Sequence, residues 1–187
     1  MEIMMPENTL SEGARQFDEK MRQGAYKEAA KIKSDYSLPD DVVQKAVKDA
    51  YDKCMYAGDY SIAADVAKQY NLPASMRNDA AMRSFSRKID SEFYRAAAEY
   101  AREFDLPEEM VHEAAIQAFN KSMSFGLVKN AAEIADEFDL PDKMKTEAAI
   151  KSFEQHMNAG LYRKALKIAL KYKLPPEMVQ EAEKKIS

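Results

Sequence analysis

The chain has few of the residues on which covalent crosslinks, metal sites and nucleophilic catalysis depend. Its 187 residues include one Cys, two His and no Trp. The lone Cys54 excludes an internal disulfide and is typical of a reducing compartment, so we expect a cytoplasmic protein. His112 and His156 lie far apart in the sequence and at different positions of the repeat described below, which argues against a zinc site. Phosphate-binding glycine loops and nucleophile elbows are also missing, so we expect no metal, no cofactor and no enzymatic activity.

Long apolar runs and a strong excess of one charge are absent as well. No run approaches the roughly 18 apolar residues that a membrane span requires, so no membrane insertion is expected. Residues 1–6 do not join a basic segment to an apolar core, which argues against a secretory signal. Lys and Arg number 28 against 32 Asp and Glu, for a net charge of −4. This mild acidity argues against nucleic acid as a partner.

Glycine and proline are few, and most of the prolines are regularly spaced. Of seven Pro, five follow a Leu, and the interval between successive Leu-Pro pairs is the same each time. These pairs are Leu38-Pro39, Leu72-Pro73, Leu106-Pro107, Leu140-Pro141 and Leu174-Pro175. A strict period of about 34 residues is the signature of stacked supersecondary units.

The same period carries apolar residues of alternating size. One repeat position holds large aromatic residues: Phe17, Tyr51, Phe85, Phe119 and Phe153. Another holds only alanine: Ala29, Ala63, Ala97, Ala131 and Ala165. Large side chains that alternate with small ones can interdigitate between neighbouring helices.

Within one repeat the apolar residues follow a helical period twice. In residues 141–174, a first stripe runs from Met144 to Met157 and a second from Tyr162 to Tyr172, with Gly160 between them. We therefore predict a helix A of about 17 residues and a helix B of about 13, with no strands. The predicted fold is all-α, a right-handed α-solenoid of five two-helix repeats, each of about 34 residues, with a C-terminal capping helix.

The period also sets the expected boundaries. A frayed N-terminus is expected at residues 1–8, followed by a single helical-repeat domain at 9–187. The capping helix is expected at 175–186, where the sequence turns polar. The five repeats are expected at about 9–38, 39–72, 73–106, 107–140 and 141–174.

Three segments resemble the turn and helix-B start of the tetratricopeptide repeat. They are Gly24-x-Tyr26-x-x-Ala29, Gly58-x-Tyr60-x-x-Ala63 and Gly160-x-Tyr162-x-x-Ala165. The chain departs from that family's pattern where an aromatic residue replaces a small residue in helix A, and where Glu92 and Val128 replace the Gly and the Tyr of the turn. What the resemblance implies is binding of a protein or peptide on the concave face lined by the A helices.

The A helices also carry a polar stripe opposite the apolar one. Its residues change from repeat to repeat while the apolar positions hold, which suits a partner-binding surface; the alternative is a solvated face with intrahelical ion pairs. The candidate partner-binding residues are Lys45, Asp49, Asp52, Tyr56, Asp79, Arg83, Ser86, Asp90, Glu113, Gln117, Asn120, Glu147, Lys151, Glu154 and Asn158.

Several residues outside this stripe have two interpretations each. Phe93 and Phe125, near A-to-B turns, are either exposed anchors for a partner or locally packed. Glu92 at a glycine position predicts a locally different turn. Segment 161–174 has five cations and no acid, so it either docks an acidic partner or complements the acidic segment 127–140.

Cys54 shares its repeat position with polar residues, so we expect it to be at least partly exposed and not a nucleophile. The other residues at this position are Lys20, Lys88, Ser122 and His156.

The leading functional hypothesis is a non-enzymatic adaptor or scaffold that binds a protein or peptide along the A-helix face. One alternative is RNA binding by helical repeats of the pentatricopeptide type, against which the acidic net charge weighs. Another is a structural spacer or self-assembling rod. The polar end of the capping helix weighs against open-ended stacking, so a monomer is favoured.

Overall fold

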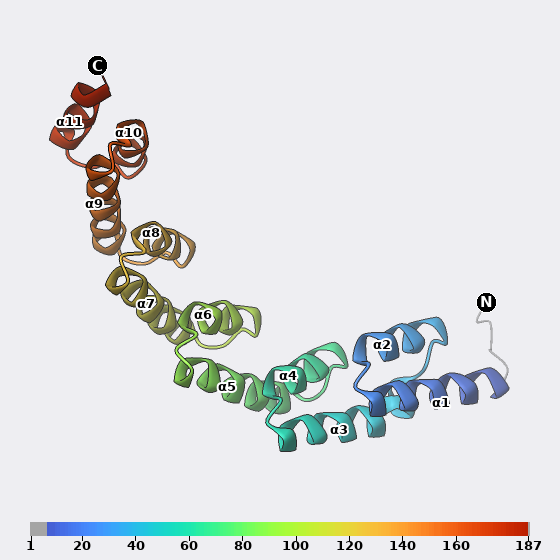
Figure 1. Ribbon diagram of the computed structural model, residues 1–187. Helices are drawn as coiled ribbons and strands as arrows, with labels where there is room; N and C mark the ends of the chain where they lie inside the picture. The colour runs from blue at the N-terminus through green and yellow to red at the C-terminus, as the bar shows by residue number, and fades with distance from the viewer. Residues whose placement is uncertain (1–6, 187) are drawn as a thin grey trace. The chain divides into compact units, whose positions relative to one another are not determined.

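In the computed structural model, which describes residues 7–186, every regular element is an α-helix (Figure 1). The first helices of the repeats are α1 (Glu7–Gln23), α3 (Asp40–Ala57), α5 (Ala74–Asp90), α7 (Glu108–Ser124) and α9 (Asp142–Asn158). The second helices are α2 (Tyr26–Asp35), α4 (Tyr60–Gln69), α6 (Tyr94–Glu103), α8 (Val128–Glu137) and α10 (Tyr162–Lys171). A last helix, α11 (Pro176–Ile186), follows them. The predicted all-α class, five helix pairs and C-terminal helix are confirmed.

Helix lengths agree with the prediction for helix A and differ for helix B. The A helices have 17 or 18 residues, whereas each B helix has 10, fewer than the sequence led us to expect. The difference arises because the residues after each B helix wind into a turn rather than extend the helix. Of the segment 1–8 that was expected to fray, residues 1–6 lie outside the described residues, and α1 begins at Glu7.

The chain divides into two compact units, one up to Ser86 and the other from Arg87 on, with the division inside α5. In the first unit, α1 packs against α2 and α3, and α3 packs against α4. In the second unit, the helices from α6 to α11 pack in chain order, each against the next (Figure 1). Each unit is therefore built from neighbouring helices of the sequence.

The Leu-Pro pair ends each B helix and starts the next A helix. The residue before each Leu has a positive φ, and the Leu N–H then donates a hydrogen bond of 2.9 Å back to a carbonyl five residues earlier in the chain. This is the Schellman arrangement, which satisfies the last carbonyls of a helix. All five Leu side chains are buried. The Pro that follows cannot continue the helix, and it precedes the first residue of α3, α7 and α9.

The A-to-B turns use the same arrangement, and this corrects the expectation for Glu92. Gly24, Gly58, Gly126 and Gly160 all have φ between 69° and 79°, and Glu92 adopts φ 57° at the same repeat position. The Glu92 N–H donates to the Ile89 carbonyl at 2.9 Å, as glycines do in the other turns. The prediction of a locally different turn was therefore wrong. Glu92 therefore follows the same backbone path as the glycines of the other turns.

The core lies along the aromatic and alanine positions of the repeat. The five aromatic residues at the position of Phe17 are all buried, and the five alanines at the position of Ala29 are completely so. Burying a ring of this size contributes roughly 1.5–3 kcal/mol relative to leaving it exposed. The small alanines let the helices approach closely enough for these rings to be covered.

Tyr70 shows how the first unit is tied together. Its ring packs edge-on against Phe17 with centroids 5.7 Å apart, and its hydroxyl donates to the Tyr26 carbonyl at 3.0 Å. The side chain joins α1, α2 and the end of α4. Burial raises the pKa of Tyr70 to about 12 from its ordinary value of 10.0.

Gly160→Ala is expected to lower the free energy of unfolding by about 1 kcal/mol, because a β-carbon disfavours φ 71°. No atom lies within 4 Å of the position that this β-carbon would take, so the cost is one of backbone conformation alone. Gly160→Asn is the matched control, since Asn tolerates this conformation better and should cost less. Urea denaturation followed by circular dichroism measures both variants, and equal stability of Gly160→Ala and the unaltered chain would contradict this account.

Tyr70→Phe is expected to reduce the alkaline sensitivity of the first unit. Because the pKa of Tyr70 is higher in the folded state, its contribution to stability is complete below about pH 10 and is lost as the pH rises toward 12. Between pH 8 and pH 11, the free energy of unfolding should fall by about 1–2 kcal/mol less in Tyr70→Phe than in the unaltered chain. Tyr56→Phe, which changes an exposed tyrosine, should lose as much as the unaltered chain. The same loss in all three proteins would refute the assignment.

Candidate functional site

The structure places all fifteen candidate residues of the A-helix stripe in exposed positions on α3, α5, α7 and α9. Some form the intrahelical ion pairs of the alternative interpretation. Asp79 pairs with Arg83 at 3.0 Å, and Glu147 with Lys151 at 3.4 Å. These pairs join exposed groups, so each adds little to stability and leaves the charges accessible.

Two of the candidates lie in a groove between α1 and α3, in the first unit. Its volume is about 390 Å³, and Lys45 and Asp49 line one side. Asp18 and Arg22 of α1 line the other side. With Lys53 of α3, the groove thus places two acidic and three basic side chains around a hollow that is open to solvent. Asp52 and Tyr56, on the same helix as Lys45, lie outside the lining.

The candidate set therefore lacked the residues that α1 supplies. Asp18 occupies the repeat position of Asp52, and Arg22 that of Tyr56, each one repeat earlier in the chain. Extending the stripe into the first repeat finds both. The sequence does not show, however, that α1 and α3 enclose a hollow, because this depends on how the axes of the two helices pack.

A second hollow lies at the A-to-B turns of the second unit. It has a volume of about 290 Å³ and is lined by Phe93, Phe125 and Leu127, with Arg95 and Lys121 beside them. Phe93 is 65% exposed and Phe125 69% exposed. The structure therefore shows exposed rings and not local packing, which were the two interpretations of these residues. Three large apolar side chains here face solvent around one hollow.

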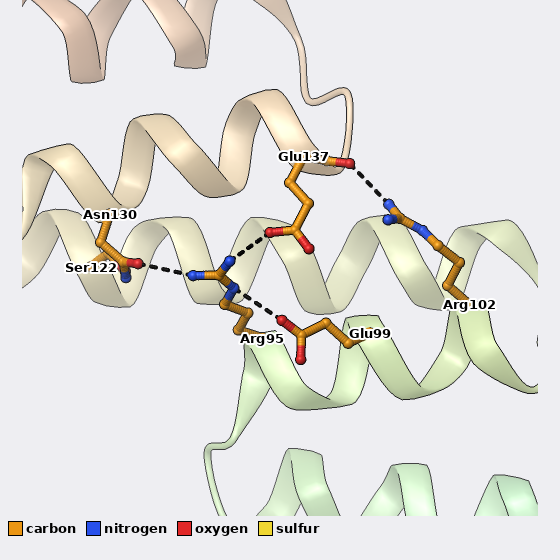
Figure 2. A network of polar contacts seen from close by, with 6 residues as sticks. All are labelled: Arg95, Glu99, Arg102, Ser122, Asn130 and Glu137. Carbon is orange, nitrogen blue, oxygen red and sulfur yellow. Dashed lines mark hydrogen bonds and ion pairs between the residues drawn. The ribbon is translucent and has the colours of Figure 1, made fainter.

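A network of hydrogen bonds fixes α6 against α8 (Figure 2), and its members Arg95, Ser122 and Asn130 line this hollow. Arg95 donates to Asn130 at 3.1 Å and to Glu137 at 2.7 Å. Asn130 in turn donates to the buried Ser122 of α7 at 2.9 Å. Arg102 adds a bond of 3.1 Å to the carbonyl of Glu137. A planar guanidinium that bonds several partners holds the two helices in one register.

Different residues of the basic segment 161–174 agree with different interpretations. Lys171 of α10 pairs with Asp136 of α8 at 2.9 Å, as the inter-repeat interpretation requires. Burial opposes ionisation of Asp136, but hydrogen bonds from Lys171 and Tyr172 outweigh it and hold the pKa of this carboxyl below its ordinary value. Arg163 and Lys164 have no ion-pair partner among the described residues. These two cations stay available.

Cys54 is buried, which corrects the expectation that it would be partly exposed. Its side chain is 5% exposed, and its Sγ lies 3.2 Å from the Tyr26 hydroxyl. The repeat position faces the core, so the small Ser122 at this position is buried too. Lysines at the same position keep their charge in water by extending their stems along the surface, and this explains the polar residues that suggested exposure.

No group of three His, Cys, Asp or Glu side chains within residues 7–186 is arranged to hold a metal ion. Over the same described range, no helix has the length and apolar character needed to cross a membrane. His112 lies 3.4 Å from Glu108 on the surface of α7, and His156 Nδ1 lies 2.7 Å from the Ser152 carbonyl one turn earlier. Both contacts are within single helices.

Comparisons of the chain with protein-family models, with curated proteins and with solved structures gave no match.

Cys54 is expected to react with a soluble disulfide reagent about a hundredfold more slowly in the folded chain than in denaturant, because only local unfolding exposes its sulfur. The double variant Cys54→Ala/Tyr56→Cys moves the thiol to a position where the native tyrosine is 96% exposed, and it should react at a similar rate in both conditions. Absorbance of the released thiolate follows the reaction. Fast labelling of Cys54 in the folded chain would show that the site is open.

Proposed function

We propose that this chain is a non-enzymatic scaffold that binds a protein or peptide through the face of its A helices. The helix-pair repeat resembles the tetratricopeptide repeat in length and in turn residues, and domains of that class bind peptides on this face. The proposal is thus a tetratricopeptide-like binding module with its own pattern of surface residues.

The observation that carries the proposal is the groove between α1 and α3. Its charged lining consists of Asp18 and Arg22 on α1 and Lys45, Asp49 and Lys53 on α3, so the charges alternate in sign along each helix. Alternating fixed charges favour a partner with the complementary order of charges and disfavour other partners. An apolar floor from Met21 and Ala50 adds contact area. Such a groove suits a polar peptide segment better than a small apolar ligand.

The contrast between fixed and variable repeat positions supports the same proposal. The aromatic and alanine positions build the core in every repeat, whereas the stripe changes charge from Lys45 to Asp79 to Glu113 at one position. Packing therefore constrains the first set, and the second set is free to be selected for recognition.

Affinity purification of the tagged chain from the lysate of its source cells, at physiological salt, tests the proposal. A stoichiometric protein partner that survives nuclease treatment is the expected result. Charge reversals at Lys45, Arg83 and Lys151 should each reduce the recovered partner severalfold, because opposed charges across an interface are disfavoured. Reversals at Lys27, Lys31 and Lys167, which are exposed on B helices, serve as matched controls.

Other outcomes separate the alternatives. Loss of every bound component on nuclease treatment would replace the proposal with RNA binding. Recovery of the bait alone, together with a mass that grows with concentration in light scattering, would favour a self-assembling rod. A partner whose recovery is unchanged by all three stripe reversals would move the binding surface away from the A-helix face.

A further inference from the structure

A second surface lies on the A-to-B turns of the second unit. We define the turn edge as Phe93, Phe125, Leu127 and Leu161, all of which are exposed. Three of them, Phe93, Leu127 and Leu161, occupy one repeat position directly before a B helix. The turn edge is distinct from the A-helix face, because its residues lie in turns and not in the polar stripe.

Local structure does not account for apolar residues at this repeat position. The residue before a helix is usually Ser, Thr, Asp or Asn, whose side chain can bond a free N–H of the first turn. No such bond is made by Phe93, Leu127 or Leu161. Their backbone conformations are nearly the same, with φ from −81° to −90°. The first unit has Ala25 and Asp59 at this position. The large apolar residues are therefore confined to the second unit, where they gain neither a cap nor a buried environment.

Hydrogen bonds between neighbouring repeats bring these turns together. Lys121 Nζ donates to the Glu92 carbonyl and Gln155 Nε2 to the Gly126 carbonyl, each at 3.1 Å. Both bonds span 29 residues and start one repeat apart, so the same bond recurs in successive repeats. Lys121 also pairs with the Glu92 carboxylate at 2.9 Å. Each turn is thus fixed to the A helix that leads into the next turn, and the apolar side chains recur in a row from turn to turn.

The row is hollowed at two places. The hollow of about 290 Å³ at Phe93, Phe125 and Leu127 is mainly apolar. A further hollow of about 400 Å³ lies beside Leu161, where Tyr162 and Ile186 add apolar surface. Pockets of this size each accept one or two side chains of a partner, and aromatic or aliphatic anchors in such pockets dominate binding energies.

The second hollow is also basic. Arg163, Lys164 and Lys185 line it, and its lining includes no acidic residue. Within the described part of the chain these three cations form no ion pair. A protein whose net charge is −4 therefore concentrates unneutralised positive charge beside an exposed apolar row. Charge complementarity then selects an acidic ligand.

We propose that the turn edge binds an acidic segment of a partner protein that carries large apolar side chains. The apolar side chains enter the hollow at Phe125 and Leu127 and contact Leu161. The carboxylates of the segment lie against Arg163, Lys164 and Lys185. This inference does not depend on the A-helix face proposed above.

A second copy of the chain fits this surface less well. Two copies related by a twofold axis would bring the same patch of each copy together. The cations around Leu161 would then meet a patch whose lining at Leu161 offers no acidic residue, which is unfavourable.

Selection from a display library of random peptides tests the proposal, with the full chain as bait. The enriched peptides are expected to combine Asp or Glu with Phe, Leu, Ile or Trp. Fluorescence anisotropy of one enriched peptide should show a Kd raised about tenfold in Phe125→Ser/Leu127→Ser, and about tenfold in Arg163→Glu/Lys164→Glu. Raising the salt concentration should weaken binding to the unaltered chain more than to the second variant.

Matched controls use residues away from the turn edge. Leu170→Ser removes a leucine that is 59% exposed, close to the 57% of Leu127, and Lys143→Glu reverses an exposed charge at the start of α9. Both should leave the Kd within about twofold of the unaltered value, since a change below about 0.4 kcal/mol is expected for surface sites outside an interface. Urea denaturation of every variant separates loss of folding from loss of binding.

Several results would overturn the proposal. Failure to enrich any peptide, enrichment of peptides without acidic residues, or equal binding by the turn-edge variants would each do so. Concentration-dependent dimerisation that Phe125→Ser/Leu127→Ser abolishes would assign the surface to a second copy instead. Peptides whose binding depends on Lys45 and Arg83 but not on the turn edge would retain the scaffold function and reject this inference.

Discussion

Both kinds of turn in this chain depend on one residue held in a left-handed conformation, and the register of the helix packing depends on those turns. After each A helix the residue is Gly or Glu92, and after each B helix it is a polar residue such as Asn71 or Asp105. Asn and Asp tolerate this conformation better than most side chains. The buried Leu that follows each B helix fixes where the helix ends. Because these ends recur at a constant interval, the same apolar positions meet in each repeat.

A core built from repeated positions leaves the remaining positions free to differ. In the first unit this freedom gives a groove of alternating charges between α1 and α3. In the second unit it gives an apolar row along the turns, beside cations that have no acidic partner among the described residues. The two surfaces differ in chemistry, so we expect them to recognise different segments of protein.

The polar contacts between helices have a different role from the apolar core. Arg95 bonds Asn130 and Glu137 of α8, and Asn130 bonds Ser122 of α7, so the network links three helices around the hollow at the turns. Its guanidinium is partly exposed, so the contribution to stability is modest and the contribution to geometry is larger. The bonds from Lys121 and Gln155 likewise hold neighbouring repeats together along the turn edge. Together these bonds define the spacing at which exposed apolar side chains are presented.

The sequence by itself determined the class of the fold, the five helix pairs, the turn positions and the aromatic and alanine core, because a strict period repeats every local preference at the same place. It also identified Phe93, Phe125 and the basic segment as residues with two interpretations. The tertiary structure decided between them, because both rings are exposed and Lys171, but not Lys164, has a carboxylate partner. It also showed that Cys54 is buried, against the expectation from the sequence. It also showed that Glu92 follows the backbone path of glycine. These outcomes depend on which side chains of neighbouring repeats meet in space, and a one-dimensional period specifies neither the reach of a side chain nor the partner opposite it.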